Sequence, residues 1–424
     1  MTKDFKKAFQ VGRPPNIVKL FPNSSALIVS GKVIDRAMIA KGKAMTIAAN
    51  ARNYFTIYGT LKAAQRANAA VIIEIAKSEG GSNAYCAINY WNMARTVDAL
   101  CNELNITIPV AIHADHYAIK DKKELAKAKL EIPSMFDAGI TSIAIDASHQ
   151  PDDENLLANI EINPYIPKWA GLETEVGEIK GKEGLSTVAE ALFLIQGLNA
   201  NGIFPDWIAL NNGTTHGIEE SAQGIQVELT KDIHNAIAKY KVSGAQHGTS
   251  GNSSERLREI ASKTNTTKAN VATALQMISW GLKVNDYGNA FMDENKDFIK
   301  IKDQGMTEEM WAEITGYAGS KSIKAGDYKK LNLPFENKLL GLPKDIRNRM
   351  SKSVENFVYN LLTKVFNAKD TAPYAIEAIL KAGSYNVGSR GKRIEKKEDW
   401  TVGKIREKGK LLNPAKGPEG NFED

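Results

Sequence analysis

The sequence predicts an α/β protein built as a TIM, or (β/α)8, barrel with a helical C-terminal extension. Three observations support this fold class: short apolar segments recur eight times, helical segments separate them, and the eight units match the roughly 250 residues of such a barrel. The chain has 424 residues, enough for one large domain or two ordinary ones. We expect a barrel with an N-terminal lead-in over residues 1–298, followed by a helical extension and tail over residues 299–424.

Each predicted strand is short and almost continuously apolar, as expected for strands buried on both faces. The predicted strands are Ala44–Ala49, Ala70–Ala76, Ile108–His113, Thr141–Asp146, Gly171–Val176, Asp206–Asn211, Tyr240–Ala245 and Gly281–Asn285. The clearest helical segments between them are Ile57–Asn68, Asn89–Leu104, Lys122–Ala138, Leu185–Leu198, Ile218–Lys239 and Ser253–Ile278. An open doubly wound sheet has the same alternation, but such sheets often carry a G-x-G-x-x-G turn after the first strand. Here the first strand is followed by Asn50-Ala-Arg52, which favours the barrel.

Composition excludes several other classes of protein. Hydrophobic residues make up 43% and charged residues 25%, close to average usage in soluble domains. No apolar run approaches the ~20 residues that span a bilayer. The start of the chain lacks the apolar segment of a secretory signal, and two cysteines are too few for a disulfide framework, so we expect a cytoplasmic protein that does not bind membranes.

Much of the excess that gives the formal charge of +6 lies in the C-terminal tail. No stacking aromatic residues alternate with these basic residues, which argues against nucleic acid as a partner. Leu339–Lys381 is predicted to be helical, and Ser351–Val365 is strongly amphipathic. From Ser384 onward the chain is rich in Gly and Lys, so we expect a tail that is mobile or docked on a neighbouring subunit of a homo-oligomer.

Five of the six histidines follow predicted strands, and carboxyl ends of barrel strands form the active-site face. They are His113, His116, His149, His216 and His247, whereas His234 lies within a predicted helix. For His149 and His234 a hydrogen-bonded loop or core histidine is the better interpretation, and His113 is expected to face the barrel interior or to lie behind the metal ligands. His116, His216 and His247 come from three different strand ends, so they can surround a metal and leave one position open, as in catalytic zinc sites. A binuclear hydrolase typically needs a His-x-His pair on strand one and an Asp ending strand eight, but Asn50 and Asn285 stand there.

Carboxylates accompany these histidines. Asp115 precedes His116 and is placed to carry a substrate hydroxyl proton. Asp146 ends strand four, where it could orient a ligand or join the metal site. Glu173 and Glu175 share one side of strand five, because alternate residues point the same way. The following Gly-bracketed loop offers Glu183 as a base that loop closure could bring in.

A phosphate site is predicted after strands seven and eight, where barrels frequently bind this anion. Small residues and hydroxyls there let N–H and O–H groups approach the anion. The segments are His247-Gly248-Thr249-Ser250-Gly-Asn and Lys283-Val-Asn285-Asp286.

Several ordered motifs between residues 44 and 290 resemble the class II fructose-bisphosphate aldolase family. They are the H-x-D-H, E-x-E-x-G, G-x-x-H-G, H-G-G-S-G and K-x-N segments, matched by His113-Ala-Asp115-His116, Glu173-Thr-Glu175-Val-Gly177, Gly213-Thr-Thr-His216-Gly217, His247-Gly-Thr-Ser-Gly251 and Lys283-Val-Asn285. The resemblance implies zinc on His116, His216 and His247, with Glu175 near a second metal position and a further divalent or monovalent cation as an option. It implies that Asp115 and Glu183 carry protons. The substrate-binding candidates are Asn50, Gly217, Gly248, Thr249, Ser250, Lys283, Asn285 and Asp286.

The implied substrate is a phosphorylated sugar, fructose 1,6-bisphosphate. After Asn285 the sequence Asp-Tyr-Gly-Asn departs from the family pattern, in a region that helps to distinguish one sugar bisphosphate from another. A tagatose-bisphosphate or related ketose-phosphate aldolase therefore stays open, as does a non-catalytic barrel subunit that stabilises an aldolase. Arg347 or Arg349 is a candidate for holding the second phosphate.

Overall fold

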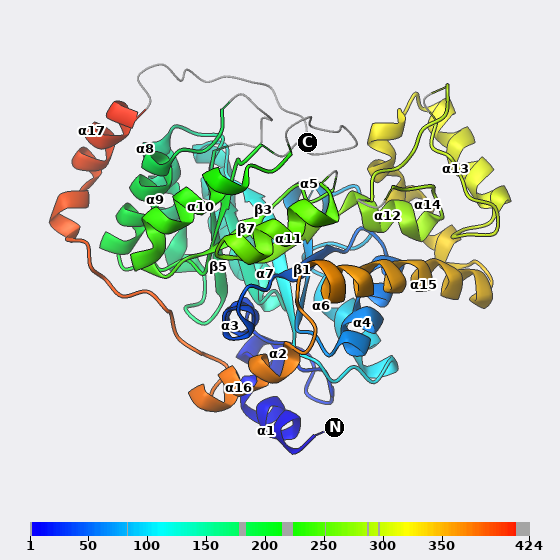
Figure 1. The fold of residues 1–424 in the computed structure, drawn as a ribbon, viewed down its shortest axis with the longest axis horizontal. Helices are drawn as coiled ribbons and strands as arrows, with labels where there is room; N and C mark the ends of the chain where they lie inside the picture. The colour runs from blue at the N-terminus through cyan, green and yellow to red at the C-terminus, as the bar shows by residue number, and fades with distance from the viewer. Residues whose placement is uncertain are drawn as a thin grey trace.

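The centre of the protein is a closed barrel of eight parallel strands in sequential order (Figure 1). The computed structural model describes residues 2–82, 84–177, 184–213, 224–250, 252–285, 288–295 and 297–412. The barrel closes because β1 pairs with both β2 and β8. The strands are β1 Thr46–Asn50, β2 Val71–Ala76, β3 Val110–Ala118, β4 Ser142–Asp146, β5 Gly171–Val176, β6 Trp207–Leu210, β7 Ser243–Gln246 and β8 Thr266–Val271. The TIM-barrel prediction is confirmed.

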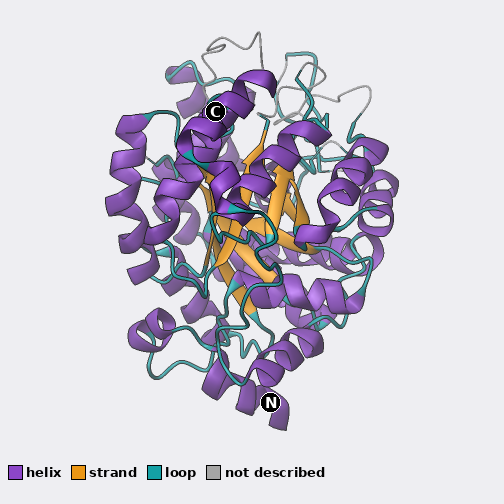
Figure 2. Ribbon diagram, turned by 90° about the vertical axis from the view of Figure 1, so that its left-hand side faces the viewer, coloured by secondary structure: helices purple, strands orange, loops and turns teal. Residues whose placement is uncertain are grey.

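Helices surround the strands on all sides (Figure 2). One helix follows each strand, except that two, α5 and α6, follow β2. The helices are α4 Tyr54–Ala67, α5 Lys77–Gly80, α6 Met93–Glu103, α7 Lys122–Asp137, α8 Asp152–Ile162, α9 Val188–Ala200, α10 Val227–Ile237, α11 Ser254–Lys263 and α12 Thr273–Trp280. Several begin at side chains that accept a hydrogen bond from the first turn, as N-caps do. These caps are Asn53, Asp121, Thr187 and Ser253.

The eighth strand is not where we predicted it. Gly281–Asn285 lies outside the barrel, in a hairpin with antiparallel bridges such as Val284 to Ala290. The true β8 interrupts the segment Ser253–Ile278, which we had interpreted as one helix and which forms α11, β8 and α12. The prediction was wrong because Lys268 and Asn270 point into a polar barrel interior, so β8 has no apolar run.

The N-terminal lead-in supports the barrel. It forms α1 Lys3–Gly12, α2 Pro15–Leu20 and α3 Gly31–Lys41. Helix α3 packs on several barrel strands. A Cβ atom on Gly31 would lie 2.4 Å from Ser142 Oγ, so only glycine lets α3 approach the strands this closely.

The C-terminal extension is helical, as predicted. After the hairpin, a lobe forms around a second apolar cluster that includes Trp280, Tyr328 and Phe335. Its elements are α13 Glu308–Ser320, η3 Ala325–Leu331 and α14 Asn332–Leu340. Helix α15 Lys344–Asn360 then returns to pack against α4 and α12, and a π-helical turn and α16 Ala372–Ala382 follow (Figure 1).

The tail does not behave as the sequence suggested. Residues 384–412 lie along this chain's own barrel, ending in η5 Lys397–Trp400 and α17 Val402–Leu412 against α8 and α9 (Figure 1). Trp400 and Ile405 belong to the main apolar core, and the Trp400 ring lies 5.5 Å from that of Phe193. A mobile tail, or one docked on a neighbour, is therefore wrong for these residues. Among the helices described, none has both the length and the apolar character to cross a bilayer.

Candidate metal centre and active site

An irregularity in β3 positions two adjacent side chains of the site. Successive residues of a strand normally point to opposite faces. Between Ala114 and Tyr117 the pairing of β3 with β4 shifts register, and His116 has a positive φ of 41°. A bulge of this kind redirects a side chain and is frequent beside active sites. It lets Asp115 and His116 serve one site although they are neighbours in sequence.

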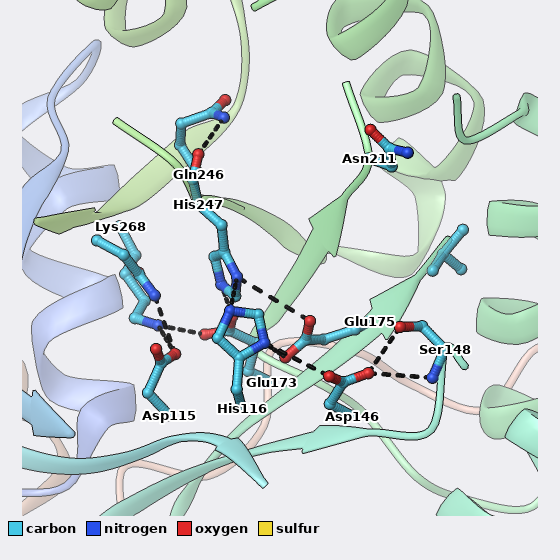
Figure 3. Close-up of polar contacts among 12 residues, drawn as sticks. Asp115, His116, Asp146, Ser148, Glu173, Glu175, Asn211, Gln246, His247 and Lys268 are labelled. Atoms are coloured by element: carbon cyan, nitrogen blue, oxygen red, sulfur yellow. Dashed lines mark hydrogen bonds and ion pairs between the residues drawn. The ribbon is translucent and has the colours of Figure 1, made fainter. Parts of the chain in front are cut away.

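The centre of the site is a pair of imidazoles (Figure 3). His247 follows β7, and its Nδ1 lies 2.7 Å from Nε2 of His116. The two ring centroids are 4.2 Å apart and the rings are nearly perpendicular. The imidazoles predicted to come from two different strand ends therefore meet.

Carboxylates hold the outer nitrogen of each ring. Glu173 Oε1 lies 2.8 Å from Nε2 of His247. Nδ1 of His116 lies 3.1 Å from Glu175 Oε1 and 3.5 Å from Asp146 Oδ2. If each outer nitrogen carries its proton toward a carboxylate, the two facing nitrogens present lone pairs, and a proton or a cation must lie between them.

The charges around His116 agree with a cation site. Burial disfavours the imidazolium, but Glu175 and Asp115 raise the pKa of His116 well above its usual value. The pKa of Glu175 is raised by burial and by Asp146. Asp146 also accepts hydrogen bonds from the backbone N–H and the hydroxyl of Ser148, at 3.0 and 2.7 Å.

The donor set fits a divalent metal ion. Asp115, His116 and His247 have ligand atoms within 4.8 Å of one another, and so do His116, Asp146 and Glu175. Imidazole nitrogen and carboxylate oxygen are ligands of zinc, and a carboxylate on the second ring nitrogen is the usual support of a ligating histidine.

Asp115 is held as a carboxylate. Its Oδ1 accepts hydrogen bonds from Asn270 Nδ2 at 2.9 Å and from Lys268 Nζ at 3.4 Å. Burial favours the neutral acid, but His116 and Lys268 hold the pKa of Asp115 well below its usual value. An ionised carboxylate beside His116 can accept a proton from a bound hydroxyl.

A buried charge network lies beneath this site, in the barrel interior. Lys268 Nζ donates to Glu173 Oε2 at 2.8 Å and to His113 Nε2 at 3.2 Å, and Glu74 Oε2 is also 3.2 Å away. Burial and the Lys268 charge lower the pKa of His113 to about 3, so this ring is neutral. His113 faces the interior as predicted, and its Nδ1 lies 2.8 Å from Ser142 Oγ.

A second buried network lies at the ends of β1 and β2. Asn50 Nδ2 donates to Glu79 Oε2, and Arg52 Nε donates to Glu79 Oε1 at 2.7 Å. Nη1 of Arg52 also donates to hydroxyl and amide oxygens of α12, at 3.2 Å each. The Oδ1 atom of Asn50 is buried without a hydrogen-bond partner among the described residues.

The loop after β7 is where the sequence predicts a phosphate site. Gly248 has a positive φ of 58°, which favours glycine. Within the described parts of the chain, no residue accepts a hydrogen bond from the backbone N–H of Gly248, Thr249 or Ser250. Thr249 directs its hydroxyl to the Asn270 carbonyl, so its backbone rather than its side chain is available to an anion.

The structure brings together five of the predicted metal and catalytic residues: Asp115, His116, Asp146, Glu175 and His247. Four others, Glu183, His216, Gly217 and Asp286, lie outside the described residues. Lys283 and Asn285 lie in the hairpin after α12, where Asn285 Oδ1 accepts from the Asn289 backbone. Their assignment depended on an eighth strand at residues 281–285, and the structure places β8 at Thr266–Val271 instead.

Sequence reasoning missed Lys268 and Asn270, although a signal was present. The K-x-N spacing recurs in Lys268-Ala-Asn270, and this copy lies on β8 beside Asp115. A single acid in the apolar run of β2, Glu74, was a second overlooked signal. His234 is a core histidine as predicted, with its pKa lowered by burial to about 4. His149 lies closer to the site than expected, with Nε2 3.9 Å from Asp146 Oδ2.

The fold and the site together define a (β/α)8-barrel protein with histidines and carboxylates gathered at the carboxyl ends of its strands. A model of the family "Fructose-bisphosphate aldolase class-II" matches residues 32–321, more than half of the chain. The chain therefore belongs to the class II fructose-bisphosphate aldolase family.

Individual relatives are more distant. A fructose-bisphosphate aldolase of Staphylococcus aureus is 36% identical over 135 residues, 32% of this chain and 43% of that protein. The chain thus spans less than half the length of this relative. A fructose-bisphosphate aldolase of Streptococcus pneumoniae is 29% identical over 242 residues, 54% of this chain and 73% of that protein.

Solved structures show the same fold. The YdjI aldolase of Escherichia coli K12 superimposes with a TM-score of 0.54 at 16% identity, over 81% of this chain and 99% of that one. A fructose-bisphosphate aldolase of Campylobacter jejuni gives 0.53 at 17% identity, over 82% and 97%.

Proposed function

We propose that the protein is a class II aldolase that reversibly cleaves fructose 1,6-bisphosphate to dihydroxyacetone phosphate and glyceraldehyde 3-phosphate. The observation that carries this proposal is the pair of facing nitrogens of His116 and His247 beside the ionised Asp115. Family membership supports the aldolase chemistry. The names of the staphylococcal and streptococcal relatives support the choice of fructose bisphosphate.

Zinc is the proposed metal. His116 and His247 would hold it, with Glu175 or Asp146 as an oxygen ligand and His216, from the sequence motif, as a third histidine. When bound, the ion would act as a Lewis acid on the ketone oxygen of the substrate. A second divalent or a monovalent cation near Glu175 is part of the same proposal.

The side chains have separate tasks. Asp115 would take the proton from the hydroxyl beside the carbon–carbon bond that breaks, because it is ionised and fixed by Asn270. Glu183 would carry the carbon-bound proton of dihydroxyacetone phosphate. The N–H groups of Gly248, Thr249 and Ser250, which have no acceptor among the described residues, would hold its phosphate, and Asn50 would accept from a substrate hydroxyl.

Cleavage assays with two substrates test the proposal. Purified protein should release triose phosphate faster from fructose 1,6-bisphosphate than from tagatose 1,6-bisphosphate. A reversed preference would indicate a tagatose-bisphosphate aldolase. A protein that contains no metal and cleaves neither sugar would be a non-catalytic barrel subunit. A homo-oligomeric state and a cytoplasmic location remain predictions.

A further inference from the structure

Lys268 is a buried lysine whose charge the reaction does not obviously require. Its side chain is fully buried in the barrel interior. Its neighbours come from β2, β3 and β5: Glu74, His113, Asp115 and Glu173. A charge in such a place costs several kcal/mol of desolvation, and an apolar side chain often packs there at least as well. Packing alone therefore does not account for a lysine at this position.

One contact of Lys268 leads to His247. The ammonium group donates to Glu173 Oε2 at 2.8 Å, and the other oxygen of the same carboxylate lies 2.8 Å from His247 Nε2 (Figure 3). Glu173 thus bridges the lysine and the imidazole. Because the lysine holds one oxygen, the other is fixed toward the ring, and the ring keeps Nδ1 directed at His116.

A second contact of Lys268 leads to the proton carrier. The same Nζ lies 3.4 Å from Asp115 Oδ1, whose other fixed partner is Asn270 (Figure 3). His113 accepts the third hydrogen of the ammonium group and is itself anchored to Ser142. The three hydrogens are therefore directed at Glu173 on β5 and at His113 and Asp115 on β3, which fixes the position of Nζ.

We propose that Lys268 is a positioning residue that joins the carboxylate orienting His247 to the carboxylate that carries the proton. Without the ammonium group, Glu173 and Asp115 would repel each other across the space it occupies. Glu173 would then no longer be held against His247, and His247 would bind metal less well. The inference rests on the proposed function, because it takes His247 as a metal ligand.

Metal affinity in a double-mutant cycle tests this inference. Lys268→Met removes the ammonium group, and Glu173→Gln keeps an acceptor for His247 but loses the ion pair with the lysine. We expect each single variant to bind zinc about 10–100-fold more weakly than the wild type, the usual effect of losing support for a metal ligand. The zinc dissociation constant is measured by competition with a chelator, and circular dichroism checks the fold.

The double variant decides how Lys268 acts. If the lysine acts on the metal through Glu173, Lys268→Met should add less than about threefold to the loss already seen in Glu173→Gln. The double variant removes one positive and one negative charge together, so this comparison holds even if Lys268→Met alone fails to fold. Full additivity of the two losses would overturn the proposal, and so would a folded Lys268→Met variant with wild-type zinc affinity.

A control variant at an exposed lysine tests whether the effect is specific to Lys268, and zinc binding by the wild type tests the proposed function itself. Lys263, exposed on α11 and paired with Glu259, provides the control Lys263→Met, which should leave zinc affinity and cleavage unchanged. An equal loss in this control would show that the Lys268 effect is not specific, and would overturn the inference. If the wild type itself bound no zinc, the proposed function would fail first.

Discussion

Replacing Asp115 with Asn should leave the fold and the metal site intact and slow cleavage severely. An asparagine has nearly the same shape, and its amide oxygen can still accept from Asn270 Nδ2, which now donates to Asp115 over 2.9 Å. The contact to Lys268 is long, at 3.4 Å, and this lysine keeps Glu173 as its closer partner at 2.8 Å. The substitution therefore removes little besides the charge and the ability to accept a proton.

The expected loss of activity follows from the role of Asp115 as a general base. Loss of a positioned general base typically costs 10²–10⁴-fold, which corresponds to about 3–5 kcal/mol in the activation barrier. The assay is the initial rate of triose phosphate release at saturating substrate, with zinc content and the melting temperature as controls. A folded, zinc-loaded Asp115→Asn protein that keeps more than about a tenth of the wild-type kcat would refute this role for Asp115.

Three further results are expected. Asn270→Ala should lower kcat/KM by about 10–100-fold, because a hydrogen bond to a charged group is worth about 1.5–3 kcal/mol. Asn285→Ala, in the hairpin, should have little effect on kcat/KM. A larger loss in Asn285→Ala than in Asn270→Ala would instead support the K-x-N motif at Lys283-Val-Asn285. Trp400→Ala should lower the free energy of unfolding by about 3–5 kcal/mol, because the ring is buried against Phe193. An unchanged denaturation curve would show that the contact of the tail with the barrel does not stabilise the protein. The pKa of His234 is lowered to about 4, so below pH 6.5 the unfolded chain binds a proton that the folded one does not, and stability falls as the pH falls. Between pH 7 and pH 4 the free energy of unfolding of the wild type should therefore fall by about 3 kcal/mol more than that of His234→Asn. Equal falls in the two proteins would contradict this.

Most of the barrel could be predicted from the sequence because its strands bury apolar side chains outward, against the helices. The exception is β8, where the inward side chains are charged or polar and conceal the strand. Lys268 and Asn270 are charged or polar because they bind Glu173 and Asp115 across the barrel interior. Strand pattern alone does not show which residues meet across the barrel, so the site's buried network emerged only from the structure.

The positions of the strand ends predicted that the histidines share one site, but not how their side chains are oriented in it. That His116 and His247 face one site could be predicted from their places at the carboxyl end of β3 and directly after β7. The bulge that turns both Asp115 and His116 to this site has no clear sequence signal, since His116 adopts a positive φ without being glycine. The tail was misjudged because only a few side chains, among them Trp400 and Ile405, bury an otherwise polar segment against the barrel.

The central claim is that a metal held at His116 and His247 is required for cleavage of a ketose bisphosphate. The most direct measurement is the rate of fructose 1,6-bisphosphate cleavage by purified protein before chelation, after chelation and after addition of zinc. We expect chelation to abolish cleavage, zinc or cobalt to restore it, and borohydride to trap no substrate on a lysine. Full activity in the chelated protein, or a trapped lysine adduct, would contradict the claim.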